Sequence, residues 1–326
     1  MSRPVSENVR NRVRLALPRR DWLKAAGLAL LSAPALAAEG DDWKAKAKKY
    51  LKPAIMSDVY AGMKLEEAAK RIREDGFVGV VTNYTFADAR FDPAAPDWRV
   101  AERIVGTLDT HGIKIVGVFG YVNVVDPVED RRKQGLARLE FLLTNWKRLG
   151  CPVVCTETGT LNRESQWVGS PENATENAYL QCRDVLSGLA KTAEKAGAVL
   201  AIEAYWQNII DSIDRAERLF REVKSPGLRL VMDPCNYYRK EDLPRMKPML
   251  EDMFRRLGPR IVLAHAKDVK ASATGTDLPV AGQGVLDYPL YLRLLAGLDR
   301  EMYLAIEHLT LKDVARARDY VLSQMR

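Results

Sequence analysis

Four apolar, strand-like runs in the second half of the chain each end in an acidic or imidazole side chain. The runs AVLAIE, LRLVMD, IVLAH and YLAIE end at Glu203, Asp233, His265 and Glu307. Apolar runs of this length are typical of strands that are covered on both faces in a parallel sheet. They recur at intervals of 30, 32 and 42 residues, roughly the length of one strand–helix–strand unit. This recurrence is the strongest constraint that the sequence places on the fold.

Similar apolar runs alternate with amphipathic stretches, such as LEEAAKRIRE, along the rest of the chain. The predicted strands span 54–60, 77–84, 113–123, 151–157, 198–206, 228–234, 261–266 and 303–308. Eight strands alternating with helices predict a closed α/β barrel of the (β/α)8 type, because every crossover can be right-handed and no sheet edge is left. An open doubly wound sheet is the competing fold, but residues 57–62 (SDVYAG) do not supply its glycine-rich phosphate turn.

Glycine and proline positions agree with this alternation. A glycine in the left-handed conformation commonly closes a helix, and such closures are predicted at Gly76, Gly112, Gly150 and Gly197. Ser170 and Pro171 predict an N-cap and a first-turn proline for a long helix that runs to Gly197.

The first 37 residues predict an export signal. Residues 19–24 (RRDWLK) form a twin-arginine pattern, followed by the uncharged run 25–37 and the small-residue cleavage site ALA at 35–37. That uncharged run is too short to cross a bilayer, so we expect no membrane association after cleavage. An ordinary secretory signal or a basic arm is the alternative. We therefore expect a cleavable signal peptide over 1–37, a barrel domain over 38–326, and a periplasmic or secreted protein.

The signal segment also accounts for most of the basic charge. Residues 1–37 hold +5 of the formal +7, so the mature chain would be near +2. This balance gives no reason to expect a nucleic-acid partner.

Export invites a disulfide interpretation of the four cysteines. However, Cys151 and Cys155 on one predicted strand would lie roughly 13 Å apart, which is too far to bridge. We favour four small, buried, apolar cysteines.

The four strand-end residues predict a metal site. In a closed parallel barrel the carboxyl ends of the strands share one face, and catalytic groups lie there. Three carboxylates and one imidazole would repel one another unless a divalent cation joined them. Mostly oxygen ligands favour Mn²⁺ or Mg²⁺ over a thiolate-type zinc site. We expect one divalent ion, Mn²⁺ first, with Mg²⁺, Co²⁺ or Zn²⁺ as alternatives.

Five motifs (LAIEAYW, VMDPCN, HAKD, AGQGVLDYPLYLRLL and LAIEH) carry a resemblance to a known family. The chain resembles the xylose isomerase-like TIM barrels, specifically the sugar phosphate isomerase/epimerase group. The resemblance implies that Glu203, Asp233, His265 and Glu307 ligate one divalent metal. It also implies that Glu203 and Glu307 face opposite sides of a bound sugar as an acid/base pair. The expected activity is carbohydrate isomerisation or epimerisation by proton abstraction next to a carbonyl, with a metal-stabilised enediolate.

Two departures from the family pattern keep rival functions open. Asn236 stands where ketose epimerases commonly have His, and Ala271 where they commonly have Arg. Since those positions contact substrate hydroxyls in the family, simple C3 epimerisation of a free ketose is in doubt. The rivals are a metal-dependent lyase or hydratase acting on 3-keto-glycosides or polyols, and a non-catalytic periplasmic sugar-binding protein. A related endonuclease is disfavoured, because its trinuclear site needs several histidines and this chain has three.

The remaining candidate residues are assigned to substrate binding: Glu157, Trp206, Asn236 and Lys267. Glu157 could bind substrate or act as an acid, or only hold a loop. Lys267 could polarise a substrate oxygen or pair with Asp268. His308 would point to the opposite side of a strand from Glu307. The expected partner is a small carbohydrate, and a homo-oligomer is compatible with the sequence.

Overall fold

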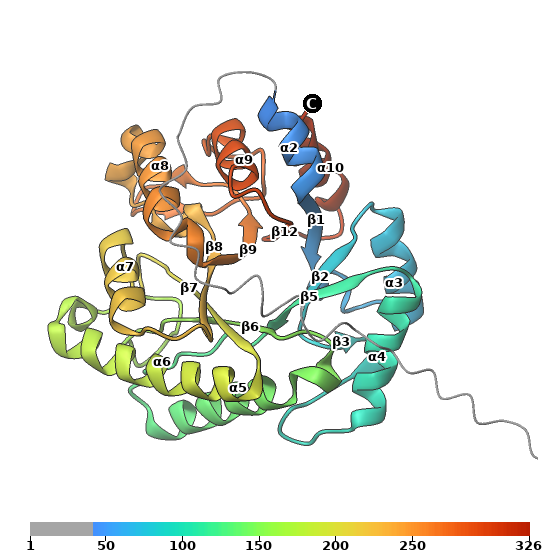
Figure 1. Ribbon diagram of the computed structural model, residues 1–326, viewed down its shortest axis with the longest axis horizontal. Coiled ribbons are helices and arrows are strands. Elements are labelled where there is room, and N and C mark those ends of the chain that lie inside the picture. The colour runs from blue at the N-terminus through green and yellow to red at the C-terminus, as the bar shows by residue number, and fades with distance from the viewer. Residues whose placement is uncertain (1–41) are drawn as a thin grey trace, which may run out of the picture. The chain divides into compact units, whose positions relative to one another are not determined.

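The computed structural model describes residues 42–326, in which eight parallel strands close into a barrel surrounded by helices (Figure 1). The strand order around the barrel is β1-β12-β9-β8-β7-β6-β5-β2. The barrel strands are β1 (Leu51–Met56), β2 (Gly79–Thr82), β5 (Lys114–Phe119), β6 (Val153–Glu157), β7 (Val199–Glu203), β8 (Leu228–Met232), β9 (Ile261–Ala266) and β12 (Met302–Ile306). The predicted (β/α)8 barrel is confirmed, whereas the predicted signal peptide over 1–37 lies outside the described residues.

The helices cover the outside of the barrel, because each strand is followed by a crossover that returns to the other end (Figure 1). The α-helices are α2 (Asp42–Tyr50), α3 (Leu65–Glu74), α4 (Trp98–Thr110), α5 (Glu129–Leu149), α6 (Glu176–Ala196), α7 (Ile213–Glu222), α8 (Met246–Leu257), α9 (Tyr288–Ala296) and α10 (Val314–Ser323). Short 3₁₀ turns are η1 (Ser57–Tyr60), η2 (Pro171–Ala174), η3 (Pro234–Tyr237), η4 (Lys240–Arg245) and η5 (Gly258–Arg260). Two small ribbons pair β3 (Thr85–Phe86) with β4 (Ala89–Arg90), and β10 (Lys270–Ala271) with β11 (Thr276–Asp277).

The predicted helix closures are confirmed at all four glycines, which have positive φ angles of 85°, 67°, 76° and 70° in chain order. The predicted cap at Ser170 is wrong. Pro171 begins the separate turn η2, and Thr175 caps α6 by accepting a hydrogen bond from the backbone N–H of Ala178. The first strand also begins and ends earlier than predicted, because residues 57–60 leave the barrel as η1.

The interior of the barrel and the strand–helix interface form one apolar core. All four cysteines are buried and free within it, as expected for small apolar residues. No helix among residues 42–326 is both long and apolar enough to span a membrane.

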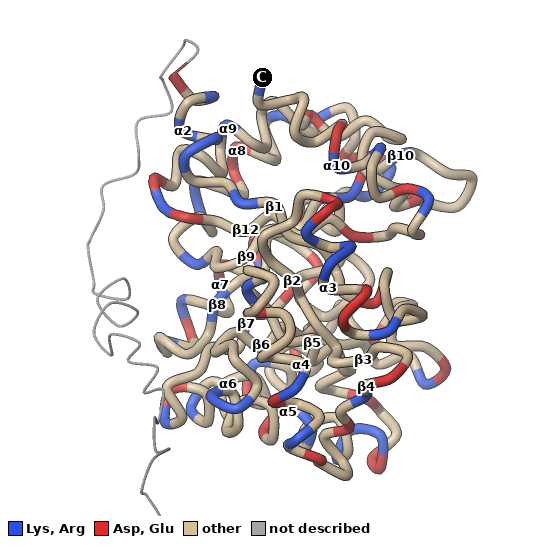
Figure 2. The backbone as a smooth tube through the Cα atoms, turned by 90° about the vertical axis from the view of Figure 1, so that its right-hand side faces the viewer, with Lys and Arg blue, Asp and Glu red and all other residues tan. Residues whose placement is uncertain are grey.

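Basic and acidic residues are interspersed along the helices rather than gathered by sign (Figure 2). Many form ion pairs between neighbouring helices, such as Arg218 with Glu176 and Arg148 with Glu102. Over residues 42–326, the tube in this view shows basic positions alternating with acidic ones and no continuous row of basic positions.

Candidate metal centre

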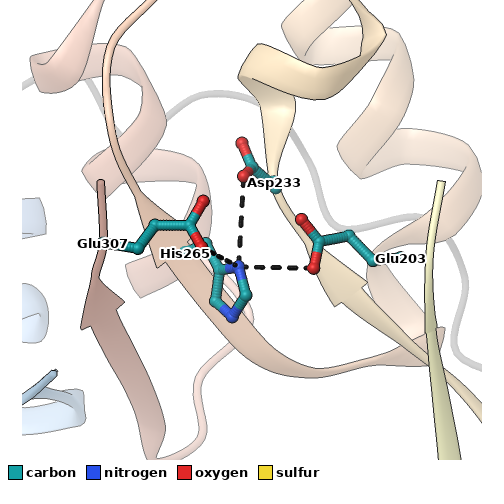
Figure 3. A group of neighbouring side chains, drawn as sticks. All are labelled: Glu203, Asp233, His265 and Glu307. Atoms are coloured by element: carbon teal, nitrogen blue, oxygen red, sulfur yellow. Dashed lines mark ion pairs between the residues drawn. The ribbon is translucent and has the colours of Figure 1, made fainter. Parts of the chain in front are cut away.

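Four neighbouring strands bring the predicted ligands to one point (Figure 3). Glu203 is the last residue of β7, and His265 lies in β9. Asp233 and Glu307 each follow the last residue of their strands, β8 and β12. These strands are adjacent in the barrel, so side chains separated by about a hundred residues in sequence converge. One ligand atom from each residue lies within 4.8 Å of the others.

The imidazole of His265 is at the centre of this group. Its Nδ1 lies 3.4 Å from Glu203 Oε2, 3.3 Å from Glu307 Oε2 and 4.0 Å from Asp233 Oδ2 (Figure 3). Neither ring nitrogen has a hydrogen-bond partner among residues 42–326, although the side chain is fully buried. Buried polar groups normally have hydrogen-bond partners. A buried imidazole that lacks one and faces three carboxylates has the composition of a ligand set for a cation.

The spacing of the group fits a single divalent ion. Oxygen and nitrogen ligands about 2.0–2.3 Å from one cation lie about 3–4 Å from each other. The distances from His265 Nδ1 to the three carboxylates, 3.3, 3.4 and 4.0 Å, fall in this range. Three carboxylates and one imidazole are ligands that Mn²⁺, Mg²⁺ and Zn²⁺ accept. The residues present therefore fit one bound divalent cation.

Neighbouring groups hold two of the carboxylates in place. Asp233 caps η3, and its Oδ1 accepts a hydrogen bond from the N–H of Cys235 at 3.0 Å, which leaves Oδ2 facing the cluster. Asn236 donates from Nδ2 to Glu203 Oε1 at 2.6 Å, and the Tyr121 hydroxyl donates to Glu203 Oε2. Such partners fix a ligand's orientation before any ion arrives.

Lys267 supplies a positive charge inside the cluster. Its Nζ lies 2.6 Å from Asp233 Oδ2 and 2.7 Å from Glu307 Oε1, and its side chain is 3% exposed. The predicted alternative of a pair with Asp268 is wrong, because Asp268 instead accepts backbone hydrogen bonds that shape the following loop. Gly284 belongs to that loop, where a Cβ would lie 2.4 Å from Asp268 Oδ1.

Burial and mutual attraction set the ionisation of these groups. Burial lowers the pKa of His265, but the charges of Glu203 and Glu307 outweigh burial and raise that pKa to about 9. Burial would raise the pKa of Glu307, yet Lys267 and His265 hold it at about 2. For Lys267, the carboxylates outweigh burial and keep the pKa well above its usual value. Burial also raises the pKa of Asp233. The cluster therefore places two protonated bases next to the ionised carboxylate of Glu307.

A cavity of about 480 Å³ opens onto the cluster and is large enough for a small-molecule ligand. Glu157, Asn236 and Lys267 line this cavity together with Glu203 and Glu307, as a substrate site requires. Burial, followed by the charge of Glu203, raises the pKa of Glu157 to about 9. Glu157 is therefore a protonated carboxyl group at neutral pH, and its role in binding or acid catalysis stays a prediction.

Trp206 does not line the cavity, contrary to the predicted sugar contact. The indole packs against Tyr205, and the centre of its ring lies 6.0 Å from the guanidinium of Arg239. Trp167, in the loop that follows β6, lines the cavity instead.

Other lining residues were not predicted from the sequence. Tyr121 follows β5, and Asp58 lies in η1 directly after β1. His308 also lines the cavity, because its φ of 57° breaks the strand alternation that would turn it away. The FGY run at 119–121, directly after an apolar run, was the one available signal for Tyr121.

The comparisons with known proteins agree with this architecture. The family model described as xylose isomerase-like TIM barrel matches residues 61–321. No curated protein matches the sequence significantly.

Three solved structures illustrate the similarity of fold. A xylose isomerase-like TIM barrel protein from Mycobacterium smegmatis, in complex with magnesium, has a TM-score of 0.63 and 19% identity over 86% of this chain and 97% of its own. A 3-keto-D-glucoside 4-epimerase from E. coli has a TM-score of 0.63 and 14% identity over 84% and 99%. A probable 3-DHS dehydratase from Bacillus anthracis has a TM-score of 0.63 and 15% identity over 84% and 97%.

Proposed function

The chain belongs to the xylose isomerase-like TIM barrel family, and from this premise we propose that it is a metal-dependent carbohydrate isomerase or epimerase. The reaction is proton abstraction from carbon next to a carbonyl, and the substrate is a small carbohydrate. The observation that carries the proposal is the convergence of Glu203, Asp233, His265 and Glu307 at one point. Two of these residues, Glu203 and Glu307, line a ligand-sized cavity.

The chemistry requires polarisation of a carbonyl and two proton-transfer groups. A divalent cation bound by the four residues would polarise the substrate carbonyl and stabilise the negative charge of an enediolate. Glu203 and Glu307 come from strands on either side of the cluster, and both line the cavity. One carboxylate would remove the proton, and the other would return it with inverted configuration.

Three neighbouring residues position or ionise these carboxylates. Tyr121 and Asn236 hold Glu203 by hydrogen bonds to its two oxygens, so its position does not depend on substrate. Lys267 holds the pKa of Glu307 low, so this carboxylate is ionised over the physiological pH range. Because Lys267 also lines the cavity, its ammonium could move to a substrate oxygen as charge develops there.

The direct test is hydrogen–deuterium exchange at carbon. Metal-loaded protein is incubated in deuterated water with ketoses and with 3-keto-glycosides, and deuterium incorporation is followed by NMR. Incorporation next to the carbonyl, abolished by a chelator and restored by Mn²⁺, is expected. Absence of exchange in every substrate of both classes would refute the proposal.

A metal-dependent lyase or hydratase is the second candidate. Two observations favour it. The position where ketose epimerases commonly have a histidine holds Asn236, whose side chain donates a hydrogen bond to Glu203. The position where they commonly have an arginine holds Ala271, which is exposed on β10 and does not line the cavity. The protonated carboxyl group of Glu157 could then donate a proton to a leaving oxygen. Release of an aglycone or water, rather than a changed stereocentre, distinguishes this reaction.

A non-catalytic sugar-binding protein is the remaining rival. It would need neither a metal nor paired carboxylates, so it predicts equal sugar binding with and without a chelator. The proposed enzyme loses binding in the chelator, because three cluster carboxylates then face the substrate with no divalent cation among them.

The metal and the cellular location complete the proposal. The oxygen-rich ligand set favours Mn²⁺, with Mg²⁺, Co²⁺ or Zn²⁺ as alternatives. The twin-arginine pattern at residues 19–24 supports export to the periplasm, where the enzyme would meet glycosides rather than phosphorylated sugars. Metal analysis of protein recovered from the periplasm tests both points.

A further inference from the structure

Apolar side chains gather around the end of the barrel that holds the cluster. The large apolar residues that are exposed in the described part of the chain are Trp167, Val168, Val285 and Leu311. Each lies in a segment that follows a barrel strand, after β6, β9 or β12, and none lies on an outer helix. Exposed apolar surface confined to one functional face marks a place where something apolar binds.

Trp167 is the member of this set that also lines the cavity, with 51% of its surface exposed. Two hydrogen bonds fasten its loop at the two residues that directly follow the indole. Thr160, which is fully buried, donates from its hydroxyl to the carbonyl of Val168 at 3.0 Å. The N–H of Gly169 donates to Oε1 of Gln207 at 2.9 Å. The fold therefore holds an exposed indole in position, at low conformational cost to a ligand.

The cavity wall combines apolar and polar groups. Aliphatic and aromatic side chains from several segments share the cavity with the cluster carboxylates: Met56, Val59, Phe119, Trp167, Leu278 and Leu309. A small carbohydrate with hydroxyl groups on every ring carbon would leave many of these groups without an apolar partner.

The charges of the cavity disfavour an anionic substrate. Among residues 42–326, Lys267 is the only lysine or arginine that lines it, and its Nζ is already engaged by Asp233 and Glu307. Asp58 and Glu203 add further acidic groups. A phosphate group is bound by several hydrogen-bond donors and positively charged side chains. The only lysine in the lining of the described residues is already paired with carboxylates, so the cavity does not suit a phosphate.

We infer that the substrate is an uncharged sugar derivative bearing an apolar, ring-sized substituent, and that Trp167 holds this substituent while the sugar faces the cluster. The inference rests on the proposed function, because it names the substrate class of the same site. It favours glycosides with an apolar aglycone over free or phosphorylated sugars. The indole supplies a flat face for stacking, as aromatic side chains do for ring-shaped ligands.

Calorimetric titration of the metal-loaded full chain with two matched probes tests the inference. The probes are the 3-keto derivatives of methyl and phenyl β-glucoside, which differ only in the substituent. We expect the phenyl compound to bind about tenfold more tightly, equivalent to about 1.4 kcal/mol. Trp167→Ala removes most of this preference, and Trp167→Phe retains most of it. Val100→Ala, which changes a partly exposed side chain on the outer helix α4 and not in the cavity lining, leaves the preference unchanged.

Equal affinity of the two probes for the wild type would overturn the inference, as would an undiminished preference in Trp167→Ala or binding of neither probe. Failure of the proposed function gives a different result. If the phenyl preference depends on Trp167 but no deuterium exchange occurs, the apolar site stands and the isomerase proposal falls.

Discussion

Replacement of Lys267 by methionine tests the charge balance of the cluster most directly. Its ammonium contacts Asp233 and Glu307 at 2.6 and 2.7 Å and is almost completely buried. Methionine fills a similar volume but leaves both carboxylates without their cation. Breaking a buried ion pair by removing one partner costs about 3–5 kcal/mol. For a domain of this size, that corresponds to a fall in the melting temperature of roughly 6–10 °C.

The expected loss depends on metal and on pH. A bound divalent cation replaces the missing positive charge, so Mn²⁺ raises the melting temperature of Lys267→Met more than that of the wild type. Lys267 holds the pKa of Glu307 at about 2, below its usual value of about 4.3. The resulting stabilisation is present above the unfolded pKa and is lost as the pH falls through the folded pKa. The difference in the free energy of unfolding between the wild type and Lys267→Met therefore becomes smaller below about pH 4.

Thermal unfolding followed by circular dichroism, in a chelator and in Mn²⁺, provides the measurement. Lys133→Met is the matched control, because Lys133 contacts Glu129 at 2.6 Å but both side chains are more than half exposed. An exposed pair of this kind contributes at most about 1 kcal/mol. The reasoning would be refuted if metal-free Lys267→Met had the same melting temperature as the metal-free wild type. It would also be refuted if Mn²⁺ raised the melting temperature of both proteins equally.

Three further predictions concern catalysis, metal binding and export. Glu203→Gln and Glu307→Gln each lower deuterium exchange by about 100-fold or more, because each removes a proton-transfer group; exchange at the wild-type rate in either variant would exclude that residue. His265→Ala loses the metal ion on dialysis, measured by elemental analysis, and a stoichiometric ion in this variant would show that the imidazole is not a ligand. Replacing Arg19 and Arg20 by lysine stops export, so the uncleaved protein accumulates in the cytoplasm; mature protein in the periplasm would contradict the twin-arginine assignment.

The barrel and the convergence of the four strand ends could be predicted from sequence, because both follow from periodicity. An apolar run that ends in a polar residue marks a strand end, and a closed parallel barrel brings successive strand ends to one face. The positions of Glu203 and His265 could be predicted without knowing the loops, because both residues lie within strands. Helix closure at Gly150 was equally local, because left-handed backbone is costly for other residues.

The residues that were missed lie where the backbone departs from regular structure. His308 turns into the cavity through a left-handed conformation, which strand alternation does not anticipate. The loop that carries Trp167 is held by a hydrogen bond from the N–H of Gly169 to Gln207, a residue in the loop after the next strand along the chain. Trp206 was preferred because it lies closer to a strand end, but it is not among the residues that line the cavity. Such placements depend on contacts between loops, for which a single sequence carries no periodic signal.

The charges of the cluster explain how the protein can fold before a metal ion binds. They also lead to a prediction about proton release. Lys267 and protonated His265 set two positive charges against the carboxylates of Glu203, Asp233 and Glu307. A metal ion can bind His265 only after its proton leaves, so metal binding at pH 7 should release about one proton per ion. Calorimetric titration in buffers of different ionisation enthalpy measures this number. Because the pKa of His265 is about 9 without metal, the release should vanish above about pH 10, where the imidazole is already neutral. Proton release that stays at zero at pH 7 would mean that the ion does not displace the His265 proton, and the ligand set would then lack its nitrogen.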